Sequence, residues 1–107
     1  MSERAIGIFD SGVGGLTVFK EIARQLPGEE YLYLGDTGRV PYGTKSPRTV
    51  LRYALEAAAF LDARRVKALV VACNTASAVA LAAIEERFNL PVIGVIEPGA
   101  RKAVTIA

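Results

Sequence analysis

One unbroken apolar run, followed directly by polar residues, constrains the fold of this chain more than any other feature. Residues 68–72 are all apolar, and Cys73, Asn74 and Thr75 follow them directly. An apolar run without alternation is typical of a strand that is buried on both faces of a parallel sheet. The pattern therefore predicts a strand over residues 66–72, with polar groups at its carboxyl end.

The residues after this run predict a helix. Asn74, Thr75 and Ser77 can each cap a helix that begins at about Ala76, so Cys73 lies between a strand end and a helix N-terminus. Ligands bind at that edge of open α/β sheets, and the positive helix end favours a thiolate. Free cysteine is often inert packing, but this one lies at a polar boundary. We therefore interpret Cys73 as a residue with a chemical function and not as a packing residue.

The rest of the chain alternates short apolar segments with helical periodicity. Strands are also predicted over residues 5–9, 30–34 and 92–96, and helices over residues 16–26, 47–64 and 76–88. Strands separated by helices imply right-handed crossovers, which predicts an α/β fold: a three-layer αβα sandwich with a four-stranded parallel sheet. Residues 1–97 are predicted to form this domain. Residues 98–107 are predicted to start a helix that leads into an absent second domain.

Composition excludes several classes of protein. The 13 basic residues are scattered among 11 acidic ones, with no basic stripe among aromatics, so we expect no nucleic-acid partner. No apolar run has transmembrane length and no signal peptide is recognisable, so we expect no membrane partner. A single cysteine indicates a reducing, cytoplasmic setting. The absence of histidine excludes a Ser-His-Asp triad, a Cys-His pair and a histidine-ligated metal within these residues.

Polar residues follow all four predicted strands. They are Asp10-Ser11, Asp36-Thr37, Cys73-Asn74-Thr75 and Glu97. A parallel sheet brings these ends to one edge, where they suit a small ligand with both charges, such as an amino acid. Asp10 and Asp36 could equally be turn or cap residues. Tyr31 and Tyr33 alternate with leucines, which favours packing on a sheet face over a role in a site.

A glycine-rich turn follows the first predicted strand. Gly12, Gly14 and Gly15 suggest a phosphate cradle. However, no Lys-Ser or Lys-Thr pair follows, and Thr17 occupies the third glycine position of the dinucleotide fingerprint. Asp10 would also repel a pyrophosphate. A nucleotide role is therefore disfavoured, while amide groups of the turn could bind a substrate carboxylate.

Three segments together resemble the glutamate racemase family, within the wider aspartate/glutamate racemase superfamily. They are FDSGVGGLT at residues 9–17, PYG at residues 41–43 and ACNTA at residues 72–76. The resemblance implies the N-terminal half of a two-domain racemase fold. It also implies a cytoplasmic homodimer that interconverts L- and D-glutamate without a cofactor and supplies the D-isomer for peptidoglycan.

The resemblance also implies roles for single residues. Cys73 is one of two catalytic thiols, and Asp10 lies close to it, assists it and contacts the substrate. The other residues that would hold the substrate are Ser11, Pro41, Tyr42, Gly43, Asn74 and Thr75. Inverting a carbon centre requires an acid and a base on opposite faces. Because this chain has one cysteine, we expect that alone it neither racemises glutamate efficiently nor binds it tightly.

Three other functions remain open at this point. The chain could belong to a related enzyme such as an aspartate racemase, or it could be an isolated amino-acid-binding or anion-binding domain without turnover. A thiol redox role is disfavoured because Cys73 lacks the resolving partner of a Cys-X-X-Cys motif.

Overall fold

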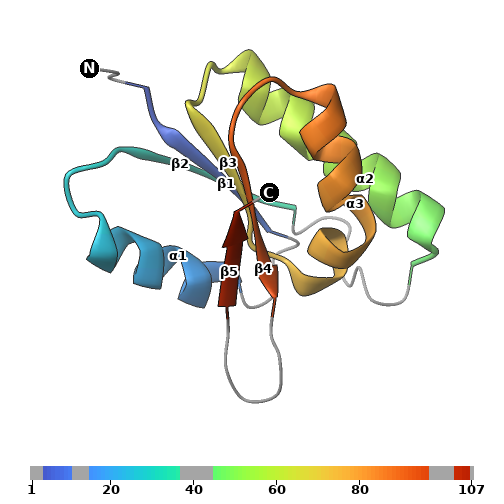
Figure 1. Cartoon of the computed structure of the whole chain (residues 1–107), viewed down its shortest axis with the longest axis horizontal. Coiled ribbons are helices and arrows are strands. Elements are labelled where there is room, and N and C mark those ends of the chain that lie inside the picture. Colours follow the sequence, from blue (N-terminus) through green and yellow to red (C-terminus); the bar gives the residue numbers. More distant parts are fainter. Residues whose placement is uncertain (1–3, 11–14, 37–44, 97–102, 107) are drawn as a thin grey trace.

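The computed structural model describes residues 4–10, 15–36, 45–96 and 103–106. Five strands form one sheet in the order β2-β1-β3-β4-β5 (Figure 1). The strands are β1 (Ile6–Asp10), β2 (Tyr31–Gly35), β3 (Ala68–Val71), β4 (Val92–Ile96) and β5 (Ala103–Ile106). The first four strands are parallel. The predicted four-stranded parallel sheet is therefore confirmed.

The fifth strand corrects a prediction. Residues 98–107 were expected to open a helix, but Ala103–Ile106 is a strand that pairs antiparallel with β4. Val104, Thr105 and Ile106 are β-branched and favour extended backbone. The edge of β4 also offers hydrogen-bonding groups to an added strand. Residues 98–102 lie outside the described residues.

Three helices connect the parallel strands: α1 (Gly15–Gln25), α2 (Pro47–Ala63) and α3 (Asn74–Arg87). The predicted start of α2 is confirmed. Ser46 is its N-cap, with Pro47 in the first position, and the Thr49 amide donates to Ser46 Oγ at 3.1 Å. Helices α2 and α3 cover one face of the sheet and α1 covers the other (Figure 1). The three layers are therefore as expected.

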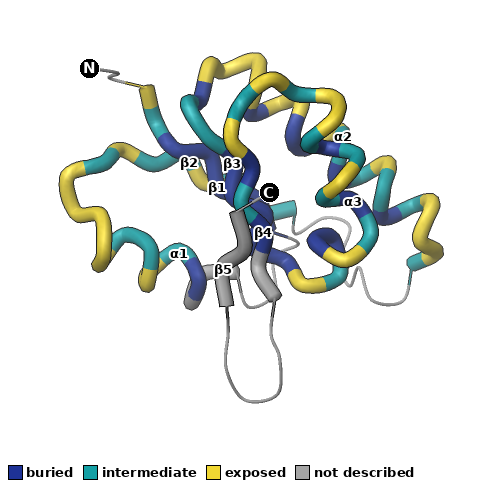
Figure 2. Tube along the Cα trace, viewed as in Figure 1, coloured by how far each residue is buried: buried dark blue, intermediate teal, exposed yellow. Residues whose placement is uncertain are grey.

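The core has two parts, one on each face of the sheet (Figure 2). Phe9, Leu69 and Val71 pack against α2 and α3. Ile8 and Val70 are buried on the α1 face. The apolar run of β3 is thus buried on both faces, which is why it shows no alternation with polar residues.

The turn after α2 contains a left-handed residue. Arg65 has φ 63° and donates its backbone N–H to Asp62 O at 2.8 Å. Glycine is usual in this conformation, because any residue with a Cβ is strained there by about 1–2 kcal/mol. We expect Arg65→Gly to raise the free energy of unfolding by about 0.5 kcal/mol, once the flexibility of glycine in the unfolded chain is subtracted. Urea denaturation measures this difference.

Arg64→Gly is the matched control. Arg64 precedes Arg65 and has φ −92°, so glycine relieves no strain there. We expect this variant to lower the free energy of unfolding by about 0.5–1 kcal/mol. Equal destabilisation by both substitutions would contradict the proposed strain at Arg65.

Candidate active site

The carboxyl ends of three adjacent strands carry the predicted polar groups. β1 lies between β2 and β3, with Asp10 paired to Gly35 and Phe9 paired to Val71. The Asp36 amide donates to Asp10 O at 2.9 Å, and the Ala72 amide donates to Phe9 O at 2.7 Å. The sheet therefore brings Asp10, Asp36 and Cys73 to a single edge, as the sequence predicted.

Cys73 lies where the strand was predicted to meet the helix. The residue is 6% exposed and its thiol forms no disulfide. Its backbone is extended (φ −115°, ψ 124°), and its Sγ accepts from the Ala76 amide at 3.5 Å. Cys73 is thus the N-cap of α3, and its sulfur faces the amino end of that helix.

This cap corrects the predicted start of the helix. α3 begins at Asn74, not at about Ala76, and the cap is Cys73 instead of Asn74, Thr75 or Ser77. The Ser77 hydroxyl donates to Val71 O at 3.0 Å and so ties the first turn of α3 to the end of β3. Because Cys73 is the last extended residue, its sulfur takes the position that an oxygen acceptor usually takes.

Among the described residues at this edge, Asp10 is the most deeply buried polar residue. It is 0% exposed, and its Oδ2 accepts a hydrogen bond from the Tyr33 hydroxyl. The prediction that Tyr33 packs on a sheet face is right for its ring, which contacts Phe19 edge-on with 5.4 Å between centroids. The sequence did not predict its hydroxyl contact. The position of Tyr33, two residues before the end of its strand, placed it near the carboxyl edge but did not identify a partner.

Asp10 and Cys73 leave the sheet on opposite faces. Cys73 belongs to the core between the sheet, α2 and α3. Asp10 lies on the α1 face, because it bonds to Tyr33, whose ring contacts Phe19 of α1. The two groups therefore share one edge and neighbouring strands, but different layers support them.

The remaining predicted site residues divide into two groups. Asn74 and Thr75 form the start of α3 beside Cys73, and Asn74 is exposed whereas Thr75 is half-buried. These two side chains are accessible at the carboxyl edge. The others, which lie outside the described residues, are Ser11, Pro41, Tyr42, Gly43, Thr37, Glu97 and the glycines at 12 and 14.

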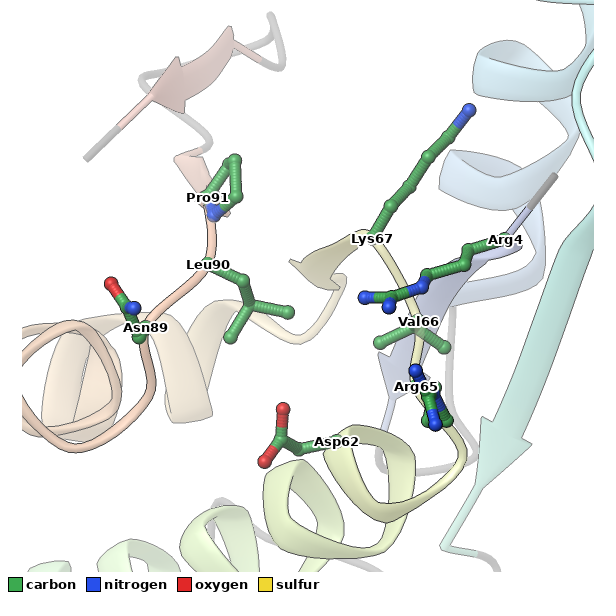
Figure 3. Close-up of a pocket in the computed structure, with 8 residues that line it drawn as sticks. All are labelled: Arg4, Asp62, Arg65, Val66, Lys67, Asn89, Leu90 and Pro91. Atoms are coloured by element: carbon green, nitrogen blue, oxygen red, sulfur yellow. The ribbon is translucent and has the colours of Figure 1, made fainter. Parts of the chain in front are cut away.

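Cavities occur at both edges of the sheet. At the carboxyl edge, a cavity of about 280 Å³ adjoins Asp36 and is closed on the α2 side by Glu56 and Phe60. At the amino edge, Arg4, Arg65 and Lys67 line one of about 380 Å³ (Figure 3).

The positively charged residues that line the amino-edge cavity do not form an anion-binding site. Figure 3 shows Lys67 and Arg65 pointing in different directions, while the Asp62 carboxylate projects toward Leu90. Lys67 also forms a salt bridge with Glu29. Because the cationic groups of this cavity do not converge on one point, we place the candidate site at the carboxyl edge.

Two further observations concern the described part of the chain only. No group of three or more histidine, cysteine, aspartate or glutamate side chains within it could hold a metal ion. No helix within residues 15–25, 47–63 or 74–87 is long and apolar enough to cross a membrane.

Comparison with known proteins gives consistent matches along almost the whole chain. A family model described as Asp/Glu/Hydantoin racemase matches residues 6–106. The glutamate racemase of Geobacter metallireducens is 65% identical over 106 residues, which are 99% of this chain and 39% of that protein.

Solved structures share the fold. The glutamate racemase from Thermus thermophilus, in complex with beta-chloro-D-alanine, matches with a TM-score of 0.85 and 58% identity, over 92% of this chain and 39% of that one. The glutamate racemase from Francisella tularensis, in complex with D-glutamate, matches with a TM-score of 0.83 and 46% identity, over 88% of this chain and 36% of that one. The chain thus spans about two fifths of the length of these relatives.

Proposed function

This chain belongs to the Asp/Glu/Hydantoin racemase family, and on that basis we propose that it is the N-terminal part of a glutamate racemase. The observation that carries the proposal is the position of Cys73. Its thiol caps α3 at the carboxyl edge, beside the strand that ends in buried Asp10. Identities of 54–65% to curated glutamate racemases favour glutamate over aspartate as the substrate.

The proposed reaction uses two thiols. The Cys73 thiolate removes the α-proton of one enantiomer, which leaves a carbanion at the α-carbon and a neutral thiol. A second thiol, supplied by residues beyond this chain, donates a proton to the opposite face and becomes the thiolate. The product is the other enantiomer, and no external oxidant or cofactor is consumed. A proton bound to carbon is weakly acidic, so the carbanion requires preorganised donors around the substrate carboxylate.

Two sets of residues would support this chemistry. We propose that Asp10 assists Cys73 and contacts the substrate. The proposed holders of glutamate are Ser11, Pro41, Tyr42, Gly43, Asn74 and Thr75. The location of Asn74 and Thr75 in the first turn of α3, next to Cys73, supports this assignment. The D-glutamate complex of the Francisella tularensis relative supports a small amino-acid ligand.

The cellular role follows from the same proposal. The domain predicted over residues 1–97, extended at its edge by β5, would be one of the two domains of each subunit in a cytoplasmic homodimer. Its product, D-glutamate, would be used for peptidoglycan and hence for cell-wall formation and cell shape. With one thiol, the 107-residue chain alone would not racemise glutamate.

A chimeric protein tests the proposal directly. In it, residues 1–107 of this chain replace the matching part of the Geobacter metallireducens relative, which supplies the remaining sequence. The 65% identity over this part favours correct folding of the hybrid. We expect the chimera to racemise L- and D-glutamate, and the isolated chain to show no exchange of the α-proton in D₂O.

Two outcomes would contradict the proposal. A folded chimera that binds glutamate without exchanging its α-proton would indicate a binding domain without turnover. Turnover of aspartate in preference to glutamate would indicate a related racemase. Circular dichroism of the chimera and of the parent relative verifies that both are folded.

A further inference from the structure

Two tyrosines of β2 contact the same helix but have different hydrogen-bond partners. The rings of Tyr31 and Tyr33 both meet Phe19 edge-on, each with 5.4 Å between centroids. The Tyr31 hydroxyl donates to Leu26 O at 2.7 Å, just beyond the last residue of α1. Burial raises the pKa of Tyr31, and the Glu29 carboxylate adds to this effect. Tyr31 therefore ties the end of α1 to the sheet.

Tyr33 instead bonds to the candidate site. Its hydroxyl donates to Asp10 Oδ2, although the tyrosine is 36% exposed and the aspartate is 0% exposed. A buried carboxylate is costly unless it accepts hydrogen bonds, and a donor to it favours the charged form. The partly exposed phenol therefore connects the buried Asp10 carboxyl group to the protein surface.

The strand register explains why Tyr33 can reach Asp10. Tyr33 pairs with Ile8, and Gly35 pairs with Asp10. Alternation places Tyr33 and Asp10 on one face of the sheet as diagonal neighbours, a separation that an aromatic side chain spans. The residue directly opposite Asp10 is a glycine, so no side chain lies between the phenol and the carboxylate.

We propose that Tyr33 is a positioning residue of the candidate site, whose hydroxyl fixes the Asp10 carboxylate as an anion at the end of β1. The inference rests on the proposed function, because Tyr33 acts on the reaction only through Asp10. Tyr33 itself touches neither the reacting atoms nor Cys73 in this assignment. Its ring contact with Phe19 holds the hydroxyl in place, since rotation about the Cα–Cβ bond of Tyr33 would break the edge-on packing.

The first test compares two hydroxyl deletions in the 107-residue chain. Tyr33→Phe and Tyr31→Phe both keep the ring and remove only the hydroxyl. That hydroxyl donates to Asp10 Oδ2 in Tyr33, and to the backbone oxygens of Ile22 and Leu26 in Tyr31. NMR of the aspartate side-chain carboxyl carbons follows the protonation of Asp10 as pH is changed. We expect Tyr33→Phe to raise the Asp10 midpoint by about one pH unit, and Tyr31→Phe to leave it unchanged. Asp36 and Cys73, which end the neighbouring strands, are the same in both variants.

An unchanged Asp10 midpoint in folded Tyr33→Phe would overturn the inference. If that variant does not fold, the reciprocal measurement decides. Asp10→Asn is expected to shift the resonance of the Tyr33 carbon that bears the hydroxyl and to leave that of Tyr31 in place. A shift of neither tyrosine, or of both equally, would exclude a specific bond between Tyr33 and Asp10.

The second test uses the chimeric protein and separates this inference from the proposed function. We expect Tyr33→Phe to lower kcat about tenfold with little change in KM, and Tyr31→Phe to leave both within about twofold. Normal kcat in Tyr33→Phe, together with a shifted Asp10 midpoint, would overturn the positioning role but not the racemase proposal. An inactive unsubstituted chimera would contradict the racemase proposal, while the NMR comparison would still decide whether Tyr33 fixes Asp10.

Discussion

Replacing Cys73 with alanine in the chimeric protein should reduce racemisation of glutamate in both directions by at least about 10³-fold, because the proposed reaction needs both thiols in each direction. Exchange of the α-proton with D₂O, in contrast, should be lost for only one of the two enantiomers. The enantiomer that Cys73 deprotonates should lose exchange, whereas the other enantiomer can still lose its proton to the second thiol. Circular dichroism measures racemisation, and proton NMR measures exchange for each enantiomer.

Ser77→Ala is the matched control for Cys73→Ala. Ser77 lies in the first turn of α3, is 8% exposed, and donates to Val71 O at 3.0 Å. Its loss should cost about 1 kcal/mol of stability and leave the rate within about twofold. Racemisation by Cys73→Ala above about a tenth of the unsubstituted rate would contradict a catalytic role for the thiol.

Leu61→Ala should lower the free energy of unfolding of the chain by about 3–4 kcal/mol. Leu61 is 0% exposed and belongs to the core between α2, α3 and the sheet. A leucine truncated in such a position loses apolar burial and leaves a cavity. For a domain whose total stability is about 5–15 kcal/mol, this is a large fraction. Urea denaturation followed by circular dichroism measures the effect.

Leu26→Ala is the comparison for Leu61→Ala. Leu26 is 47% exposed, so its truncation removes less buried surface. The expected loss is below about 1 kcal/mol. Similar losses for the two variants would mean that the layer formed by α2 and α3 contributes less to stability than its burial indicates.

The sequence was sufficient to predict the parallel sheet and the edge at which polar groups gather. Both depend on local patterns: an apolar run, such as residues 68–72, and the polar residue that follows it. The start of α3 was less predictable, because sulfur is not among the usual capping acceptors and oxygen-bearing residues follow Cys73 directly. The strand Ala103–Ile106 forms by pairing with the edge of β4. The local sequence pattern, which favoured a helix, contains no information about that pairing.

The hydroxyl partner of Tyr33 was not predictable for a related reason. Alternation along β2 indicates which face a tyrosine occupies, but not which residue of the neighbouring strand lies diagonal to it. That requires the register, in which Tyr33 pairs with Ile8 and Gly35 with Asp10. Contacts set by the alignment of two strands are a property of the pair, and neither strand's sequence contains them alone.

The placement of Asp10 and Cys73 on opposite faces of the sheet has a consequence for how such a site can change over time. The carboxylate is held through Tyr33 and Phe19 in the α1 layer, and the thiol is packed in the α2 and α3 layer. Substitutions that accumulate in α1 therefore reach the carboxylate first and leave the packing around the thiol intact. Natural variation in α1 can thus alter the surroundings of the Asp10 carboxylate while the surroundings of the Cys73 thiol are inherited unchanged.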